Sequence, residues 1–289
     1  MAQSTDTVAV SFEVYPPRSA EKMPDLQESI RVLDSVSPDF ISVTFGAGGS
    51  STRDSLEVLR FIRDESSATP LAHLTCVGTT RQEASELVVS FLAEGITHFL
   101  ALRGDLPEGA LEHHGELHYA VDLVTLMREL PGTPKPLERI AVAAFPNGHP
   151  ESHSLDHDVE TLLRKQEAGA TLAITQLFFY TEHYLTFVEK AHGAGVTIPI
   201  LPGLMPVVSP GRLNRVVELS GENRPSELSE ALSSTEDAAA REAIGVDWTA
   251  HMVRELVDAG APGIHLYAFN QHRTVLSVLE QSGVRQCIQ

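Results

Sequence analysis

Two charged side chains follow an apolar run in the middle of the chain. The run His98–Leu102 is typical of a buried strand, and Arg103 and Asp105 come directly after it, two positions apart. Period-two geometry predicts that both side chains point to the same face of this strand. Because an isolated buried charge is costly, we expect that face to open on a cleft, a ligand or a partner charge. A structural ion pair at the strand end is the alternative.

Another acid lies inside an apolar run near the N-terminus. Glu13 stands within Val8–Tyr15, whose other residues are mostly apolar. Burial disfavours a charged carboxylate, so we expect the pKa of Glu13 to be raised, which suits a general acid near neutral pH. An ion pair with Arg18, or with another inward-facing base, is the alternative.

Two predicted loops carry glycines and histidines. Gly46–Ser51 opens a helix, where backbone N–H groups suit a phosphate, but an ordinary turn explains the segment equally well. His149, His153 and His157 recur every four residues. Because the sequence has no H-E-x-x-H or Cys-x-x-Cys pattern, we predict no metal site.

Further candidates lie on a predicted helix and a predicted strand. Lys165 lies two helical turns after Asp158, so the two side chains share a face, although a solvated surface lysine is the alternative. Gln176 interrupts an apolar run. The aromatic run Phe178–Tyr180 after it is more typical of a core than of a ring-stacking site.

Strand-like and helix-like segments alternate along the whole chain. The predicted strands are Val8–Tyr15, Phe40–Phe45, Leu71–Val77, His98–Leu102, Ile140–Phe145, Leu172–Phe179, Ile198–Met205 and Gly263–Phe269. The predicted helices are roughly 21–36, 52–64, 80–94, 117–130, 155–168, 181–194, 209–219, 236–259 and 271–282. Eight alternating units predict one α/β domain over 1–289, a (β/α)8 TIM barrel with extra helices between its seventh and eighth strands.

Polar side chains alternate with apolar ones in these strands. The polar positions are Ser11 and Glu13, Ser42 and Thr44, His73 and Thr75, Arg103 and Asp105, and Gln176. One face of each barrel strand points into the barrel, and catalytic groups gather at the carboxyl ends of the strands. Repetition over five strands therefore predicts a functional cleft at that end of the barrel.

Composition narrows the classes of partner. The formal charge of −18 argues against nucleic acid, and four lysines leave few groups to bind an anion. Two cysteines suit a reducing cytoplasm, and no apolar run has the length of a signal peptide or a membrane span. We expect a cytoplasmic protein with small-molecule substrates, and the sequence leaves a homo-oligomer open.

Five segments together resemble the bacterial, FAD-dependent methylenetetrahydrofolate reductases, in order and with similar spacing. They are Ser11–Arg18, Ser42–Gly46, Ala72–Cys76, Ala101–Pro107 and Ile174–Phe179. The resemblance implies a barrel oxidoreductase carrying FAD, which NADH or NADPH reduces. The flavin would then pass hydride to 5,10-methylenetetrahydrofolate, giving 5-methyltetrahydrofolate for methionine biosynthesis. It also implies no regulatory domain and no inhibition by S-adenosylmethionine.

The same resemblance assigns roles to residues. Glu13 matches the general acid that assists opening of the methylene bridge, Asp105 matches the aspartate that tunes the flavin at its N1–C2 carbonyl edge, and Gln176 matches a glutamine that hydrogen-bonds the folate ring. The positions matching FAD contacts are Thr44, His73, Arg103, Gly104, Asp105, Tyr119, Ala120, Phe145, His149, Asp158 and Lys165.

This chain departs from the family pattern at several positions. Phe145 stands where many relatives have a tyrosine, and Arg212 and Val216 replace a glutamine and a phenylalanine that help to hold folate and nicotinamide. Gln271 replaces an arginine that pairs with the folate tail, so Arg273 or Arg212 is expected to substitute.

Two other functions stay open at this point. One is a related barrel oxidoreductase that runs oxidatively or works without flavin. The other is a non-enzymatic pterin- or flavin-binding protein, for which the altered folate positions are the best argument.

Overall fold

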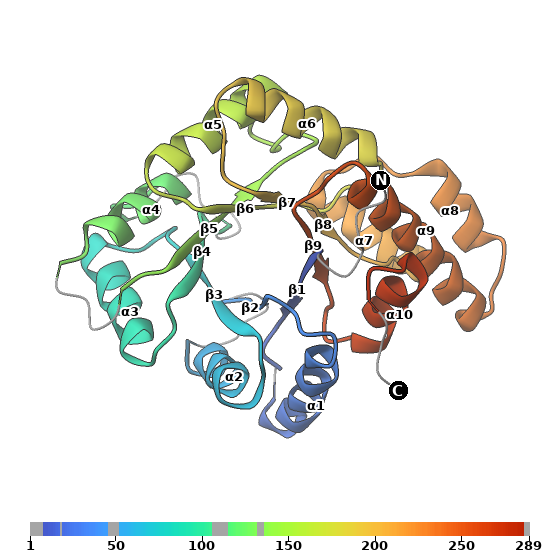
Figure 1. Cartoon of the computed structure of the whole chain (residues 1–289), viewed down its shortest axis with the longest axis horizontal. Coiled ribbons are helices and arrows are strands. Elements are labelled where there is room, and N and C mark those ends of the chain that lie inside the picture. Colours follow the sequence, from blue (N-terminus) through green and yellow to red (C-terminus); the bar gives the residue numbers. More distant parts are fainter. Residues whose placement is uncertain (1–7, 18, 46–51, 106–114, 132–135, 286–289) are drawn as a thin grey trace.

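A barrel of parallel strands, surrounded by helices, forms the molecule (Figure 1). The computed structural model describes residues 8–17, 19–45, 52–105, 115–131 and 136–285. The strands in these ranges are β1 (Ala9–Val14), β2 (Phe40–Val43), β3 (Thr69–Thr75), β4 (His98–Leu102), β5 (Arg139–Ala144), β6 (Leu172–Thr175), β7 (Ile200–Leu201), β8 (Gly203–Leu204) and β9 (Gly263–Tyr267). Their order in the sheet is β7-β6-β5-β4-β3-β2-β1-β9-β8.

The barrel closes through an interrupted strand. β7 pairs with β6 and β8 pairs with β9, and Pro202 alone separates β7 from β8. Proline has no N–H to give to a strand ladder, but the Pro202 carbonyl accepts from the His265 backbone N–H at 3.0 Å. The predicted continuous strand Ile198–Met205 was therefore wrong in detail. The two short strands together take the seventh position, and the (β/α)8 barrel is confirmed.

Helices cover the outside of the barrel. After a short 3-10 turn, η2 (Ala20–Lys22), they are α1 (Met23–Asp34), α2 (Thr52–Glu65), α3 (Arg81–Ala93), α4 (Ala120–Glu129), α5 (Leu155–Glu167), α6 (Thr181–Gly193), α7 (Pro210–Ser220), α8 (Ser226–Ser233), α9 (Ala238–Asp258) and α10 (His272–Ser282). The helices α7, α8 and α9 lie between β8 and β9, which confirms the extra helices predicted there.

Local sequence explains where helices near the carboxyl ends of the strands begin. Thr80 accepts a hydrogen bond from the Glu83 backbone N–H, and the Glu83 carboxylate accepts one from the Thr80 backbone N–H, a capping box that starts α3. Ser209 accepts from the Arg212 backbone N–H, and Pro210 follows it in the first turn of α7. These caps fix the points at which loops leave the rim of the barrel.

Apolar side chains pack on both faces of the barrel strands, outside and inside the barrel. Side chains on the outer faces of the strands pack against the helices, as Phe12 and Leu74 do. The interior cluster consists of Phe40, Leu71, Leu100, Ala141, Leu172, Ile174 and Leu201. At the amino-terminal end Arg139 pairs with Asp39 at 3.0 Å. This end of the barrel is thus filled, as in a packed core.

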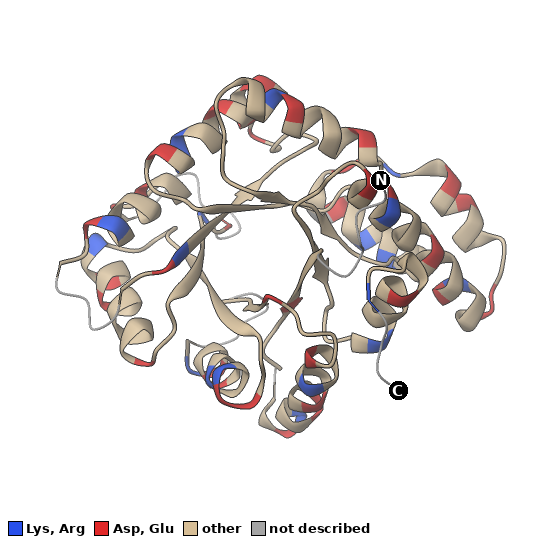
Figure 2. Ribbon diagram, in the orientation of Figure 1, with Lys and Arg blue, Asp and Glu red and all other residues tan. Residues whose placement is uncertain are grey.

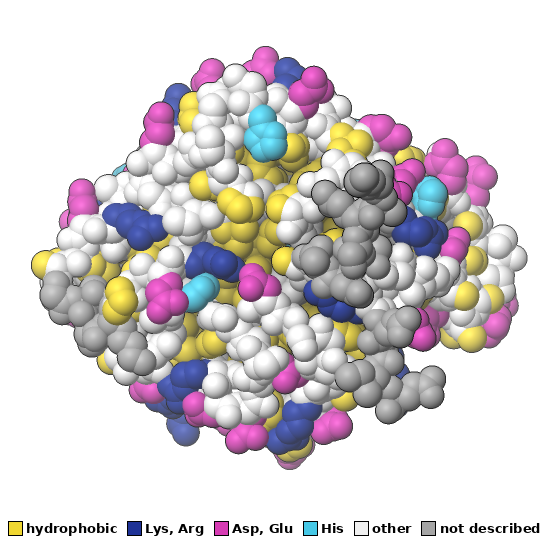
Figure 3. Space-filling view, in the orientation of Figure 1, with side chains coloured by type: hydrophobic (Ala, Val, Ile, Leu, Met, Phe, Trp, Pro, Cys, Tyr) yellow, Lys and Arg dark blue, Asp and Glu magenta, His cyan; other side chains and the backbone are white. Residues whose placement is uncertain are grey.

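Charged residues lie mainly on the helices, and few stand on the strands (Figure 2). On the face shown in Figure 3, basic side chains are scattered among acidic ones. Among the helices of the described ranges, none combines the length and the hydropathy that crossing a membrane would require.

Candidate active site

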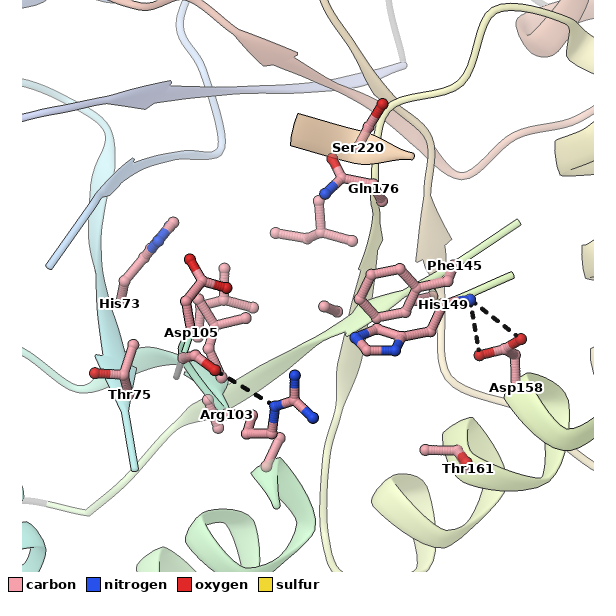
Figure 4. A pocket seen from close by; sticks show the side chains of 18 of the residues that line it. His73, Thr75, Arg103, Asp105, Phe145, His149, Asp158, Thr161, Gln176 and Ser220 are labelled. Carbon is pink, nitrogen blue, oxygen red and sulfur yellow. Dashed lines mark hydrogen bonds between the residues drawn. The ribbon is translucent and has the colours of Figure 1, made fainter. Parts of the chain in front are cut away.

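A cavity of about 1240 Å³ opens at the carboxyl ends of the strands. Its wall comes from β1, β3, β4, β5, β6 and β9 and from the loops that follow several of them. Figure 4 shows how part of this wall converges from separate strands and helices. The predicted residues on it are Glu13, Thr44, His73, Arg103, Gly104, Asp105, Tyr119, Ala120, Phe145, His149, Asp158, Lys165 and Gln176. The predicted cleft therefore lies at the predicted end of the barrel.

Glu13 lies near the end of β1 with its side chain 15% exposed. Burial raises the pKa of Glu13 from 4.5 to about 8, as the sequence predicts. Glu13 Oε2 lies 3.5 Å from His73 Nε2, but burial lowers the pKa of His73 to about 3. Both side chains are therefore uncharged at pH 7, and their contact is no ion pair. Arg18, the other partner considered, lies outside the described residues.

A polar layer inside the barrel adjoins Glu13. Ser11 Oγ lies 2.9 Å from His265 Nδ1, and burial, helped by His73, lowers the pKa of His265 to about 3. Ser42 faces Glu13 in the register of β1 and β2. Ser42 Oγ and the Nε2 atoms of both histidines are buried without a hydrogen-bond partner among the described residues. Each such atom costs roughly 1–3 kcal/mol, so this polar layer lowers the stability of the barrel.

Tyr267 stands beside Glu13 in the register of β1 and β9. Its hydroxyl donates to the Thr175 carbonyl at 2.7 Å. Gly203 makes this approach possible, because a Cβ at that position would lie 2.9 Å from the Tyr267 hydroxyl oxygen. Burial and the neighbouring Glu13 raise the pKa of Tyr267, so the phenol stays a neutral donor in the cavity wall.

The end of β4 differs from the prediction. β4 stops at Leu102, and the chain turns at Gly104, whose φ is 87°. A Cβ on Gly104 would lie 2.9 Å from Val77 Cγ1, so this turn requires glycine. The prediction that Arg103 and Asp105 share a strand face was wrong, because strand geometry ends before them. Both reach the cavity through the turn.

The partner of Arg103 is not Asp105. Arg103 Nη2 donates to Glu151 Oε1 at 2.8 Å, and Nη1 donates to Oε2 of the same carboxylate. Asp105 is exposed at the rim and acts on Arg103 only as a nearby charge. Because Arg103 pairs with a different carboxylate, the Arg103–Asp105 ion pair considered from sequence is not formed.

The start of α5 and the loop before it form one wall (Figure 4). The His149 backbone N–H donates to Asp158 Oδ1 at 3.3 Å, and the His149 ring meets the Phe145 ring edge-on at 4.7 Å between centroids. Lys165 is 8% exposed and donates to the Ala143 carbonyl at 2.8 Å. Burial lowers the pKa of Lys165 to about 8. It is therefore not a solvated surface lysine.

Gln176 follows β6 directly and does not lie inside it, since β6 ends at Thr175. Its Oε1 accepts from the Leu177 backbone N–H at 2.9 Å, which leaves the amide NH2 group to face the cavity. Phe178 and Phe179 are 2% and 4% exposed. They are core residues, as predicted.

The remaining predicted substrate residues lie apart from this wall. Arg212 lies near the start of α7 with its guanidinium over the Phe269 ring, 5.4 Å from the centroid, and Phe269 lines the cavity. Gln271 and Arg273 are exposed at the start of α10 and do not line it. The structure thus brings Arg212 to the rim through Phe269 and leaves Gln271 and Arg273 outside.

Metal ligation finds no support in the described residues. Within them, no group of three or more histidine, cysteine, aspartate or glutamate side chains is placed to hold a metal ion. The candidate phosphate loop Gly46–Ser51 lies outside the described residues.

Three residues of the site were missed by the sequence analysis. His265 and Tyr267 alternate in the last strand, so the period-two argument applied to the other strands would have found them. Glu151 gave no such signal, because it meets Arg103 across 48 positions of sequence.

The barrel and its cavity define the class: a (β/α)8 protein with a large cavity at the carboxyl ends of its strands. Within that class, the chain belongs to the methylenetetrahydrofolate reductase family, whose model matches residues 1–283. Relatives in this family are oxidoreductases by name.

Individual relatives agree with this assignment. The chain is 34% identical over 286 residues to 5,10-methylenetetrahydrofolate reductase of Escherichia coli, covering 99% of this chain and 94% of that one. It is 30% identical to methylenetetrahydrofolate reductase (NADH) 1 of Arabidopsis thaliana, covering 96% of this chain and 48% of that one. An uncharacterized protein from Clostridium thermocellum that binds two copies of 5-methyl-5,6,7,8-tetrahydrofolic acid shares the fold, with TM-score 0.66, 14% identity and 96% of each chain covered.

Proposed function

We propose that this protein is a methylenetetrahydrofolate reductase: NADH or NADPH reduces bound FAD, and hydride then reaches 5,10-methylenetetrahydrofolate to give 5-methyltetrahydrofolate. The observation that carries the proposal is a buried, protonated Glu13 in the wall of a large cavity, in a chain of this family.

The residues of the cavity fit an FAD molecule. Its volume of about 1240 Å³ exceeds the roughly 300–1,000 Å³ of ordinary small-molecule sites. Arg103 and Lys165 supply positive charge for a diphosphate, and Thr44 Oγ1 and His73 Nε2 are buried polar atoms without a partner in the described residues. When bound, FAD supplies a two-electron carrier that accepts hydride from nicotinamide and gives it to folate. The side chains that would hold it are those of the β3, β4 and α5 walls.

Glu13 supplies the proton in this scheme. With its pKa near 8, the carboxyl is mostly protonated at pH 7 and can donate to a nitrogen of the methylene bridge as the bridge opens. The neighbouring His73 and His265 stay neutral, so no adjacent cation stabilises the carboxylate and makes it release its proton early.

Asp105 lies at the rim of the cavity, in surroundings unlike those of Glu13. Its carboxylate is exposed, whereas Glu13 is buried, so the two acids of the cavity differ in their surroundings. A carboxylate beside the flavin disfavours added negative charge there and favours a cationic folate species. We expect Asp105→Asn to raise the flavin reduction potential and to slow folate turnover, and an unchanged potential would contradict this role.

A spectroscopic experiment tests the proposal. The purified chain should show flavin absorbance that NADH or NADPH bleaches and that methylenetetrahydrofolate restores under anaerobic conditions. A colourless protein that still oxidises NADH with the folate would indicate a flavin-free reductase. A protein that binds flavin or folate without turnover would be a binding protein only.

A further inference from the structure

An ion pair crosses the part of the cavity wall that could bind an anion. Arg103 and Glu151 meet as two planar forks, through Nη2 to Oε1 at 2.8 Å and through Nη1 to Oε2. Guanidinium groups bind phosphate with the same bidentate geometry as carboxylate. Glu151 therefore occupies the edge of Arg103 that a phosphate would use.

Other cations on the described wall do not replace Arg103. Lys165 adds positive charge, but its ammonium already donates to the Ala143 carbonyl at 2.8 Å and has no planar fork of donors. Arg164 lies 3.7 Å from Glu160, one turn earlier on its own helix. Arg103 is thus the described cavity residue with both a fixed donor fork and a position at a strand end.

Glu151 is held by its backbone while its carboxylate reaches solvent. Its N–H donates to His149 Nδ1 at 3.1 Å, and the Ser152 N–H donates to the His149 carbonyl at 2.8 Å. The Glu151 side chain is 59% exposed, against 20% for Arg103. The backbone of Glu151 is thus anchored independently of its carboxylate, which meets Arg103 from the solvent side.

We propose that Glu151 is a built-in competitor that sets the affinity and selectivity of this cavity for anionic ligands. In the free protein it neutralises Arg103, and a diphosphate displaces its carboxylate. Only a ligand that presents a bidentate anion compensates for the lost fork, so diphosphates are selected over uncharged ligands. The inference rests on the proposed function in one respect, that the anion is the diphosphate of the cofactor.

Binding measurements on the full chain test this proposal. Glu151→Gln should bind FAD and ADP about fivefold more tightly than the parent, the ratio expected from removing a partly exposed competitor. Riboflavin, which has no phosphate, should bind equally to both. Glu129→Gln is the matched control, since it removes one charge from another exposed arginine pair, Arg81–Glu129, whose residues do not line the cavity.

A second variant shows whether the effect acts through Arg103. In an Arg103→Gln background, adding Glu151→Gln should leave the affinity for ADP unchanged. Equal or weaker ADP binding by Glu151→Gln alone would overturn the proposal and make Glu151 a positioning residue for Arg103. Inorganic pyrophosphate, used as a competitor of ADP, tests the role of Glu151 even if the protein binds no flavin. Absence of flavin binding would count against the proposed function and not against the role of Glu151.

Discussion

The two sides of the cavity are built in different ways. The β3–β5 side consists of His73, Arg103, His149, Asp158 and Lys165. On the β9–α7 side Phe269 lines the cavity and Arg212 lies over its ring, while Gln271 and Arg273 lie outside the wall at the start of α10. On the first side three of the five side chains are less than a tenth exposed, and backbone groups fix several of them. On the second side the polar groups are exposed or reach the cavity only through an aromatic ring.

This difference distinguishes side chains whose position is constrained by burial from side chains that can be replaced at little cost. A buried lysine or aspartate is costly unless a ligand or partner uses it, so such residues constrain the β3–β5 side. An exposed arginine costs little wherever it stands. We therefore expect cofactor binding to depend on a few residues whose replacement has large effects. Replacement of residues on the β9–α7 side should have only small effects on folate binding.

Glu13 lies between the two sides of the cavity. Its replacement should have the largest effect of all, because it should slow folate reduction and leave flavin reduction intact. Glu13→Gln is expected to slow folate reduction by roughly 10²–10⁴, the usual contribution of a general acid. Flavin reduction by NADH should continue, because the β3–β5 side is unchanged. Stopped-flow measurement of the two half-reactions tests this. Equal losses in both would mean that Glu13 shapes the whole cavity and donates no specific proton.

The same substitution should change how stability depends on pH. The carboxyl is protonated below its ordinary pKa of 4.5 in both states, but between pH 4.5 and about 8 only the unfolded chain releases the proton. Relative to Glu13→Gln, the wild type should therefore lose stability as pH rises through this window. The lowered pKa values of His73 and His265 favour the folded state as pH rises toward 6.5, but they do so in both proteins and cancel in the comparison. Between pH 5 and 8 the variant should gain roughly 2–4 kcal/mol over the wild type in urea unfolding. The exposed Glu129→Gln variant should show no such trend.

The sequence predicted one side of the cavity better than the other for a physical reason. Glu13 and His73 lie inside strands, where a period of two determines the face to which a side chain points. Arg103 lines the cavity, but not through the predicted strand face, because the strand ends at Leu102 and Gly104 turns the chain. Nothing in the local pattern indicates Glu151, which meets Arg103 only through a tertiary contact.

The interrupted seventh strand shows the same limit. Apolar periodicity predicted Ile198–Met205 as one strand, and the barrel position is correct. Pro202 divides it, because a proline cannot donate to a ladder. On the β9–α7 side the polar residues stand on helices and loops, so sequence periodicity did not show which of Arg212, Gln271 or Arg273 reaches the cavity.

Gly104 tests how rigid the β3–β5 side is. Gly104→Ala should cost about 1–3 kcal/mol of stability through its positive φ, and should also weaken FAD binding, because the new Cβ would push on Val77 and Thr75. Gly260→Ala is the matched control: its φ is also 87°, and nothing lies within 4 Å of the added Cβ. Both variants should lose stability through the positive φ, and Gly104→Ala should lose more because its Cβ also meets Val77 and Thr75. Only Gly104→Ala should bind FAD more weakly in a titration. Unchanged FAD affinity in both would mean that the turn at Gly104 can shift without disturbing Arg103.

The smallest expected effect belongs to the β9–α7 side. Arg212 lies over Phe269, whose ring lines the cavity, whereas Arg273 is exposed and does not line it. Arg212→Ala should therefore raise KM for methylenetetrahydrofolate about fivefold, the scale of one exposed charge contact, with kcat little changed. Arg273→Ala should leave both constants within about twofold of the parent. If Arg273→Ala raised KM and Arg212→Ala did not, the start of α10 would have to move toward the cavity when folate binds. The β9–α7 side would then be assembled by its substrate, in contrast to the β3–β5 side, which is already in place.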